Sequence, residues 1–320
     1  MNRHKPEACK RCKRNVERCQ LCQTVAVCKM CDTEQDEQGH QDFCGQIQQQ
    51  REKYQTLKEE QLQPMQTSND VCEKLADETF RLVDKMLEAT FKKQLLLATV
   101  DDMVNLLTYQ GIEKFWGHDY IKLLIPALCI CQNEDQKAYA FALWFLRPHD
   151  GPFEFAKSKD HSMFEDVNLF VENTISRQAW IFRAPLTLIK FRLLKDLRYL
   201  QQRPQRLQDL RGHQRPYVLR PGGPQRTSGM KRFLRENDLA DRIAKLEGEI
   251  EILAKFPDDM GPAWEDFWEL MFYRPEHAWV PQDRPESIPD AMRQVIKANY
   301  HSWFVAPEAF QEMSKLGFIQ

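Results

Sequence analysis

Seven cysteines and one histidine lie at short, regular intervals near the N-terminus of this 320-residue chain. They form three C-x2-C pairs followed by H-x3-C, namely Cys9, Cys12, Cys19, Cys22, Cys28, Cys31, His40 and Cys44. A structural zinc ion takes four thiolate or imidazole ligands at the corners of a tetrahedron. Each C-x2-C pair supplies two of these ligands from one turn. The eight residues are therefore enough to bind two Zn²⁺ ions.

Spacing alone leaves the pairing of these ligands open. Sequential pairing would join the first two cysteine pairs, whereas interleaved pairing would join the first pair with the third. In either arrangement all four positions of each zinc are filled, so both sites are predicted to be structural rather than catalytic. Metal binding contributes about 10–16 kcal/mol per structural zinc in zinc-finger peptides. We therefore expect zinc removal to unfold this module and to spare the rest of the chain.

The alternative use of closely spaced cysteines is disulfide bonding. The first residues are basic and lack an apolar stretch, so they do not read as a secretory signal. We therefore expect an intracellular protein of the nucleus or cytoplasm, where thiols stay reduced. This expectation favours metal over disulfides.

The pattern from Cys9 to Cys44 resembles the MYND-type zinc finger, in which three cysteine pairs precede H-x3-C. B-box fingers share part of this spacing but usually end in two histidines. The MYND resemblance implies interleaved sites, with one zinc on Cys9, Cys12, Cys28 and Cys31 and the other on Cys19, Cys22, His40 and Cys44. It also implies binding of short proline-containing peptides by strand addition. The peptide surface would then be Gln23, Thr24, Val25, Ala26 and Val27.

The remainder of the chain is predicted to be helical, which makes the fold class mainly α: a small two-zinc finger (1–45) followed by an all-α domain. Residues 46–66 are polar and helix-favouring, and we expect a spacer helix there. Residues 67–202 carry apolar side chains at three- and four-residue steps, which predicts a helical domain. This part loosely resembles uncharacterised fungal proteins that combine a MYND-like finger with a helical domain.

Residues 203–232 are predicted to form a basic, proline- and glycine-rich loop, with eight Lys or Arg against one Asp. Residues 1–18 add seven Lys or Arg against two Glu. These two segments support an alternative function as a nucleic-acid-associated regulatory protein. The formal net charge of −2 gives that alternative no global support.

Residues 233–320 are predicted to form C-terminal helices packed on the helical domain. Leu239, Ile243, Leu246, Ile250 and Leu253 form a seam of about two heptads, which is too short for a lasting coiled coil and favours packing within the chain. An aromatic stripe at helical spacing is predicted to be core, and consists of Trp264, Phe267, Trp268, Met271 and Phe272.

No catalytic template is recognised in the chain, and no catalytic residue is assigned. MYND fingers often accompany SET-type methyltransferases, but the nearest string here is Asn299-Tyr300-His301-Ser302, which has an inserted tyrosine. Cys129 and Cys131 lie on an apolar stretch and are predicted to be buried small hydrophobes. The sequence contains no run of about 18 apolar residues, so no membrane helix is predicted. The leading hypothesis is a non-enzymatic zinc protein whose finger docks other proteins.

Overall fold

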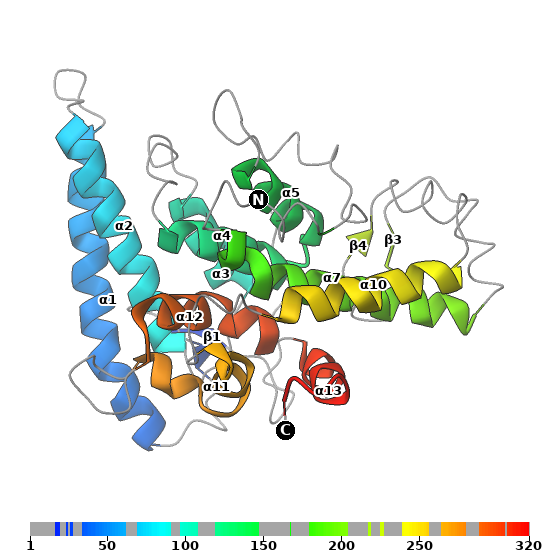
Figure 1. The fold of residues 1–320 in the computed structure, drawn as a ribbon. Helices are drawn as coiled ribbons and strands as arrows, with labels where there is room; N and C mark the ends of the chain where they lie inside the picture. Colours follow the sequence, from blue (N-terminus) through cyan, green and yellow to red (C-terminus); the bar gives the residue numbers. More distant parts are fainter. Residues whose placement is uncertain are drawn as a thin grey trace. The chain divides into compact units, whose positions relative to one another are not determined.

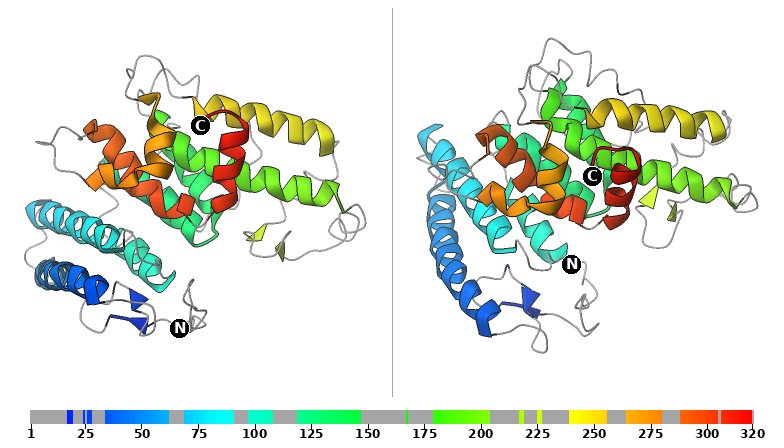
Figure 2. Two further views of the ribbon diagram at one scale, coloured as in Figure 1. Left: turned by 90° about the horizontal axis from the view of Figure 1, so that it is seen from below. Right: turned by 60° about the horizontal axis from the view of Figure 1, so that its bottom comes forward.

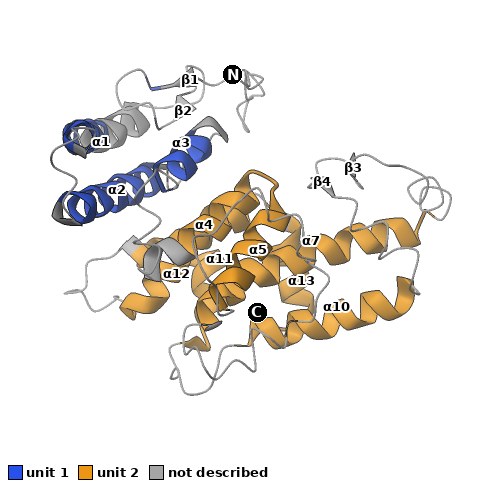
Figure 3. Cartoon of the chain, turned by 90° about the horizontal axis from the view of Figure 1, so that it is seen from above, with its two compact units in different colours: residues 1–121 blue, residues 122–320 orange. Residues whose placement is uncertain are grey.

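The computed structural model describes residues 17–19, 24, 26–27, 34–61, 69–90, 97–107, 119–146, 167, 179–203, 217–218, 225–226, 239–255, 264–279, 288–304 and 306–319. These residues are mainly helical, so the predicted mainly-α class is confirmed for the described part of the chain. The chain divides into two compact units, Met1–Ile121 and Lys122–Gln320 (Figure 3).

Three helices and a short strand ladder make up the described part of unit 1. Helix α1 (Glu34–Gln61) packs along α2 (Asn69–Thr90), and α3 (Leu97–Leu107) contacts α2 (Figure 1). Strands β1 (Glu17–Arg18) and β2 (Ala26–Val27) pair in antiparallel register.

Helix α1 begins twelve residues before the spacer helix expected at residues 46–66. It begins before the last two predicted zinc ligands and continues past the expected start of the spacer without a break. Its sequence is rich in Gln, Glu and Lys, which favour helix, and Pro64 follows shortly after its end. Ile47 and Tyr54 are buried on this otherwise polar helix. Since α1 also packs along α2, it is part of the unit rather than a solvated spacer.

Helix α7 (Arg183–Gln201) is the central element of unit 2, and nearly all of its side chains are buried. Helix α10 (Leu239–Ala254) runs along it (Figure 2). The seam residues Ile243, Leu246, Ile250 and Leu253 are buried, as expected for packing within the chain. Helices α4 (Asp119–Cys131) and α5 (Asp135–Leu146) precede α7, and the 3-10 helix η3 (Ala179–Phe182) leads into it.

The turn between α4 and α5 contains a residue whose backbone is in the left-handed helical conformation. Asn133 has φ 62°, and the amides of Asn133 and Glu134 donate hydrogen bonds to the carbonyls of Ile130 and Cys129. These are the two hydrogen bonds of a Schellman motif, in which asparagine is one of the tolerated residues. The Asn133 side-chain oxygen also accepts a hydrogen bond from Arg192, which ties the turn to α7.

The aromatic stripe forms part of the core of unit 2, as predicted. It lies around α11 (Phe267–Tyr273), which is followed by the 3-10 helix η6 (Pro275–Trp279) and by α12 (Asp290–Phe304) and α13 (Pro307–Lys315). Trp268 and Trp303 pack with ring centroids 5.0 Å apart. The Trp268 indole donates a hydrogen bond to the Ala254 carbonyl at 2.7 Å, so the buried ring nitrogen is satisfied.

A second short ladder joins β3 (Tyr217–Val218) to β4 (Gln225–Arg226). These four residues are the described part of the predicted basic loop beyond Arg203. The rest of the loop lies outside the described residues.

Candidate metal centre

Two of the predicted zinc ligands come together at the N-terminal half of α1. Cys19 directly follows β1, and Cys44 lies on α1. Their Sγ atoms are 3.8 Å apart. Cys44 is buried and Cys19 is partly buried. The structure thus brings together two thiols that are 25 residues apart in the chain.

The sulfur–sulfur distance fits two ligands of one tetrahedral zinc. With Zn–S bonds of about 2.3 Å and tetrahedral angles, two sulfurs lie about 3.8 Å apart. A disulfide requires about 2.05 Å. The observed 3.8 Å therefore matches metal-ligand spacing and not a sulfur–sulfur bond.

His40 lies four residues before Cys44 on α1, so the two backbone positions are one helical turn apart. The other predicted ligands lie outside the described residues, and they are Cys9, Cys12, Cys22, Cys28 and Cys31. Among the side chains that the structure describes, no three His, Cys, Asp or Glu residues form a cluster. Cys19 and Cys44 are therefore the described part of the predicted centre.

The predicted peptide segment 23–27 follows the Cys19–Cys22 pair. Thr24 is fully buried, and its carbonyl accepts a hydrogen bond from the Thr99 hydroxyl of α3 at 2.9 Å. Arg51 of α1 donates to the Thr24 hydroxyl at 3.4 Å. Thr24 thus faces the helices of unit 1, so a bound peptide would have to contact other residues of the segment.

The remaining residues of that segment are placed only in part. Ala26 and Val27 form β2, so they have the extended conformation that strand addition requires. A two-stranded ladder leaves the outer edge of each strand outside the ladder's own hydrogen bonds. Gln23 and Val25 lie outside the described residues.

A further pair of cysteines, spaced C-x-C, lies outside the predicted finger and has no exposed thiol. Cys129 and Cys131 are buried on α4. Burial raises the pKa of the Cys129 thiol to about 12, with a further contribution from the nearby Glu134 charge. The Cys129 thiol therefore stays neutral, and the burial of both residues agrees with the small buried hydrophobes that the sequence predicts.

The string resembling a methyltransferase motif lies on helix α12. The Asn299 side-chain amide donates to the Val295 backbone carbonyl at 3.0 Å. The Ser302 hydroxyl donates to the Asn299 backbone carbonyl at 2.7 Å. Asn299, His301 and Ser302 are all buried. The described contacts of Asn299 and Ser302 are thus made to their own helix.

Sequence reasoning missed a set of buried ion pairs around α7. The fully buried Lys190 lies 2.8 Å from Glu249 of α10, and Arg192 lies 3.2 Å from Asp135 of α5. The sequence signal was present, because Lys190 and Arg192 interrupt an otherwise apolar run. Such interruptions normally mark a solvated face, and here they mark interhelical pairing.

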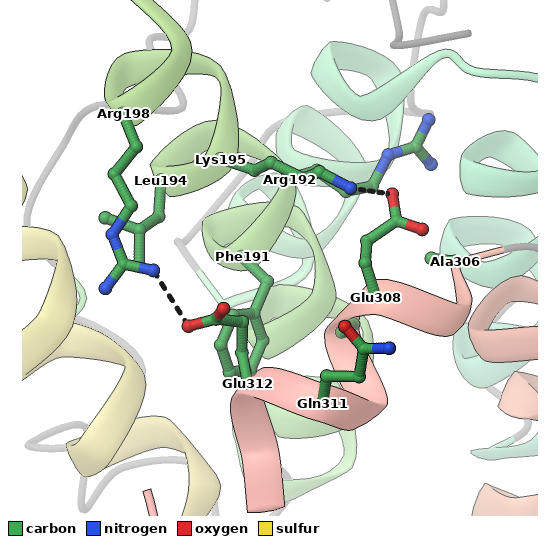
Figure 4. A pocket seen from close by; sticks show the side chains of 10 residues that line it. Phe191, Arg192, Leu194, Lys195, Arg198, Ala306, Glu308, Gln311 and Glu312 are labelled. Atoms are coloured by element: carbon green, nitrogen blue, oxygen red, sulfur yellow. Dashed lines mark hydrogen bonds and ion pairs between the residues drawn. The ribbon is translucent and has the colours of Figure 1, made fainter. Parts of the chain in front are cut away.

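A groove of about 200 Å³ lies between α7 and α13 (Figure 4). Phe191 lies on its α7 side, and ion pairs cross it between Lys195 and Glu308 at 2.7 Å and between Arg198 and Glu312 at 2.8 Å. Burial opposes ionisation of Glu312, but hydrogen bonds from Lys315 and Arg198 lower its pKa overall. These four groove charges pair with one another, so we assign no ligand to it.

Comparison of the chain with protein-family models, with curated proteins and with solved structures found no match. Within the described helices, none combines the length and the apolar character needed to cross a membrane.

Proposed function

We propose that this chain is a zinc-binding adaptor whose N-terminal finger docks segments of other proteins. The observation that carries the proposal is the 3.8 Å separation between the Cys19 and Cys44 sulfurs. That separation suits two thiolates on one zinc ion, and the two residues belong to the same site in the interleaved arrangement. The zinc ligands are Cys9, Cys12, Cys28 and Cys31 for one ion and Cys19, Cys22, His40 and Cys44 for the other.

Zinc has a structural role in this proposal. Thiolates and an imidazole fill all four positions, so no position is open for water or substrate. The chain's residues position the site: β1 leads directly into Cys19, and α1 carries His40 and Cys44. The protein is accordingly not an enzyme at this centre.

Peptide docking is proposed on the segment 23–27. Support comes from the extended conformation of Ala26 and Val27 in β2, next to the cysteine pair that contains Cys19. Main-chain hydrogen bonds along an outer strand edge would provide affinity with little dependence on sequence. Thr24 contributes by anchoring the segment rather than by contacting the peptide.

Metal content tests the zinc proposal directly. We expect about two zinc equivalents per chain when the native protein is purified without chelator and analysed by elemental mass spectrometry. Cys44→Ser should carry fewer equivalents. Cys72→Ser is the matched control, because Cys72 lies on α2 outside the ligand pattern, and it should match the native protein. Native protein with about zero equivalents would refute the proposal.

Partner binding is tested on the full chain. Affinity purification with the native protein, Cys44→Ser and Cys72→Ser should recover partners that the first variant loses and the second retains. In NMR titration with a proline-rich peptide, we expect shift changes for the amides of residues 23–27. If partners persist with Cys44→Ser, or if the shifts fall only on other residues, the finger is not the docking site.

A further inference from the structure

We infer that the zinc held through Cys19 and Cys44 also stabilises helices α1–α3, so that unit 1 depends on metal as one body. This inference rests on the proposed zinc binding. It departs from the sequence-based expectation that zinc removal unfolds the finger and spares the rest. It also makes the α1–α2 helix pair an element that metal occupancy controls.

The first step is the position of Cys44. It is buried within α1 and lies three residues before the fully buried Ile47. Three residues along a helix return to the same face, so both side chains belong to one packed stripe. A metal bond at Cys44 therefore holds the N-terminal part of α1 to the segment that follows β1.

The second step is that few of the α1 side chains that the structure describes are buried. Among its described side chains, the buried ones are Cys44, Ile47 and Tyr54. Helices in proteins are stabilised mainly by packing of an apolar face and only weakly by propensity. A metal–sulfur bond at Cys44 would therefore add to the limited packing that these described side chains provide.

The third step is the link to α3. Thr24 lies five residues after Cys19, and its buried carbonyl accepts the Thr99 hydroxyl at 2.9 Å. Arg51 of α1 donates a hydrogen bond to the Thr24 hydroxyl at 3.4 Å. Cys19 thus lies beside Cys44 of α1, and Thr24 contacts Arg51 of α1 and Thr99 of α3. Releasing Cys19 from metal would free one end of the segment 19–24 and weaken the Thr24 contacts.

Helix α2 completes the coupling. It packs along α1, where the Gln50 amide donates to the Glu78 carbonyl at 3.4 Å, and it contacts α3. Unit 2, in contrast, has its own core around α7 and the tryptophans of α11 and α12. Metal loss should therefore loosen all three helices of unit 1 and leave unit 2 folded.

Hydrogen exchange of the full-length protein, with and without a strong zinc chelator, tests this inference. We expect amides in α1 and α3 to exchange about tenfold or more faster after chelation, because they lose protection through local opening. Amides in α7 should be unchanged. Faster exchange restricted to residues 1–33 would overturn the coupling while keeping the zinc proposal. No change anywhere, in a protein without zinc, would instead refute the zinc proposal itself.

Substitution of Thr99 isolates the proposed link. Thr99→Val removes the hydroxyl donor, and we expect full zinc content but a smaller effect of chelation on α3. Thr99→Ser restores a hydroxyl and should restore the native response. Thr79→Val is the matched control, because its equally buried hydroxyl donates to the Leu75 carbonyl within α2. If Thr99→Val and Thr79→Val respond alike, Thr99 does not transmit metal binding.

Discussion

The buried ion pair between Lys190 and Glu249 provides a quantitative test of how α10 is held on α7. Lys190 has no exposed side-chain surface and Glu249 is 5% exposed, with the ammonium nitrogen 2.8 Å from the carboxylate. The Lys190 ammonium nitrogen also lies over the Tyr139 ring, 5.8 Å from the ring centroid. The test is the substitution Lys190→Met, which keeps most of the side-chain volume and removes the charge.

The expected cost follows from the burial of the partner. Removing one member of a buried pair leaves the other charge uncompensated, which typically costs about 3–5 kcal/mol. For a unit of this size, that free energy corresponds to a fall of roughly 6–20 °C in Tm. The double variant Lys190→Met/Glu249→Leu removes both charges, so its cost should be well below the sum of the two single costs.

Lys245→Met is the matched control in the same chain. Lys245 approaches the same carboxylate at 3.7 Å, but its side chain is 42% exposed. Exposed pairs contribute about 0–1 kcal/mol because water screens them. The two lysine substitutions therefore remove the same charge near the same carboxylate, and they differ in burial.

Urea unfolding followed by tryptophan fluorescence is a suitable assay. Of the seven tryptophans, only Trp116 precedes residue 122, so the signal reports mainly on unit 2. A Lys190→Met cost no larger than that of Lys245→Met would show that the buried pair does not hold α10. A double-variant cost equal to the sum of the single costs would show that the two charges do not interact.

Three further predictions concern side chains elsewhere in unit 2. The Cys129 thiol, with a pKa raised to about 12, should resist maleimide at pH 8 in the native protein and react after denaturation, as measured by mass spectrometry. Asn133→Ala should lower the free energy of unfolding by about 1 kcal/mol because alanine disfavours φ 62°, which denaturant titration would detect. Lys315 and Arg198 outweigh burial and lower the pKa of Glu312, so its stabilisation is present above the unfolded-state pKa and lost as pH falls through the folded-state value. Glu312→Gln should therefore flatten the acidic side of the stability profile, and an unaltered profile would contradict this.

Most helices of unit 2 were predictable because their apolar residues repeat at helical spacing. The helices predicted within 67–202 include α7, and those predicted within 233–320 include α12 and α13. The charged residues of α7 were harder to interpret from the sequence. Lys190 and Arg192 look like solvent-facing residues in sequence, and their partners on α10 and α5 are distant in the chain.

The candidate metal centre was predictable in its residue types but not in its surroundings. Thiol and imidazole spacing indicates ligands, because few other uses explain four such pairs. Spacing does not reveal which residue packs behind a ligand. The Thr24–Thr99 hydrogen bond joins residues 75 apart in the sequence, and the spacing of the ligands does not point to Thr99.

The boundary expected at residue 45 illustrates why composition alone misplaces a module. The cysteines stop at Cys44 and a glutamine-rich stretch begins, so the sequence changes character there. The backbone does not change, because α1 continues through this point and buries Cys44 and Ile47 on either side of it. A helix that carries both a candidate metal ligand and part of a helical core cannot be divided between two independent modules. A truncation starting at residue 46 would remove the first twelve residues of α1 and the Cys44 contact together, so the finger and the helices of unit 1 are best studied as one piece.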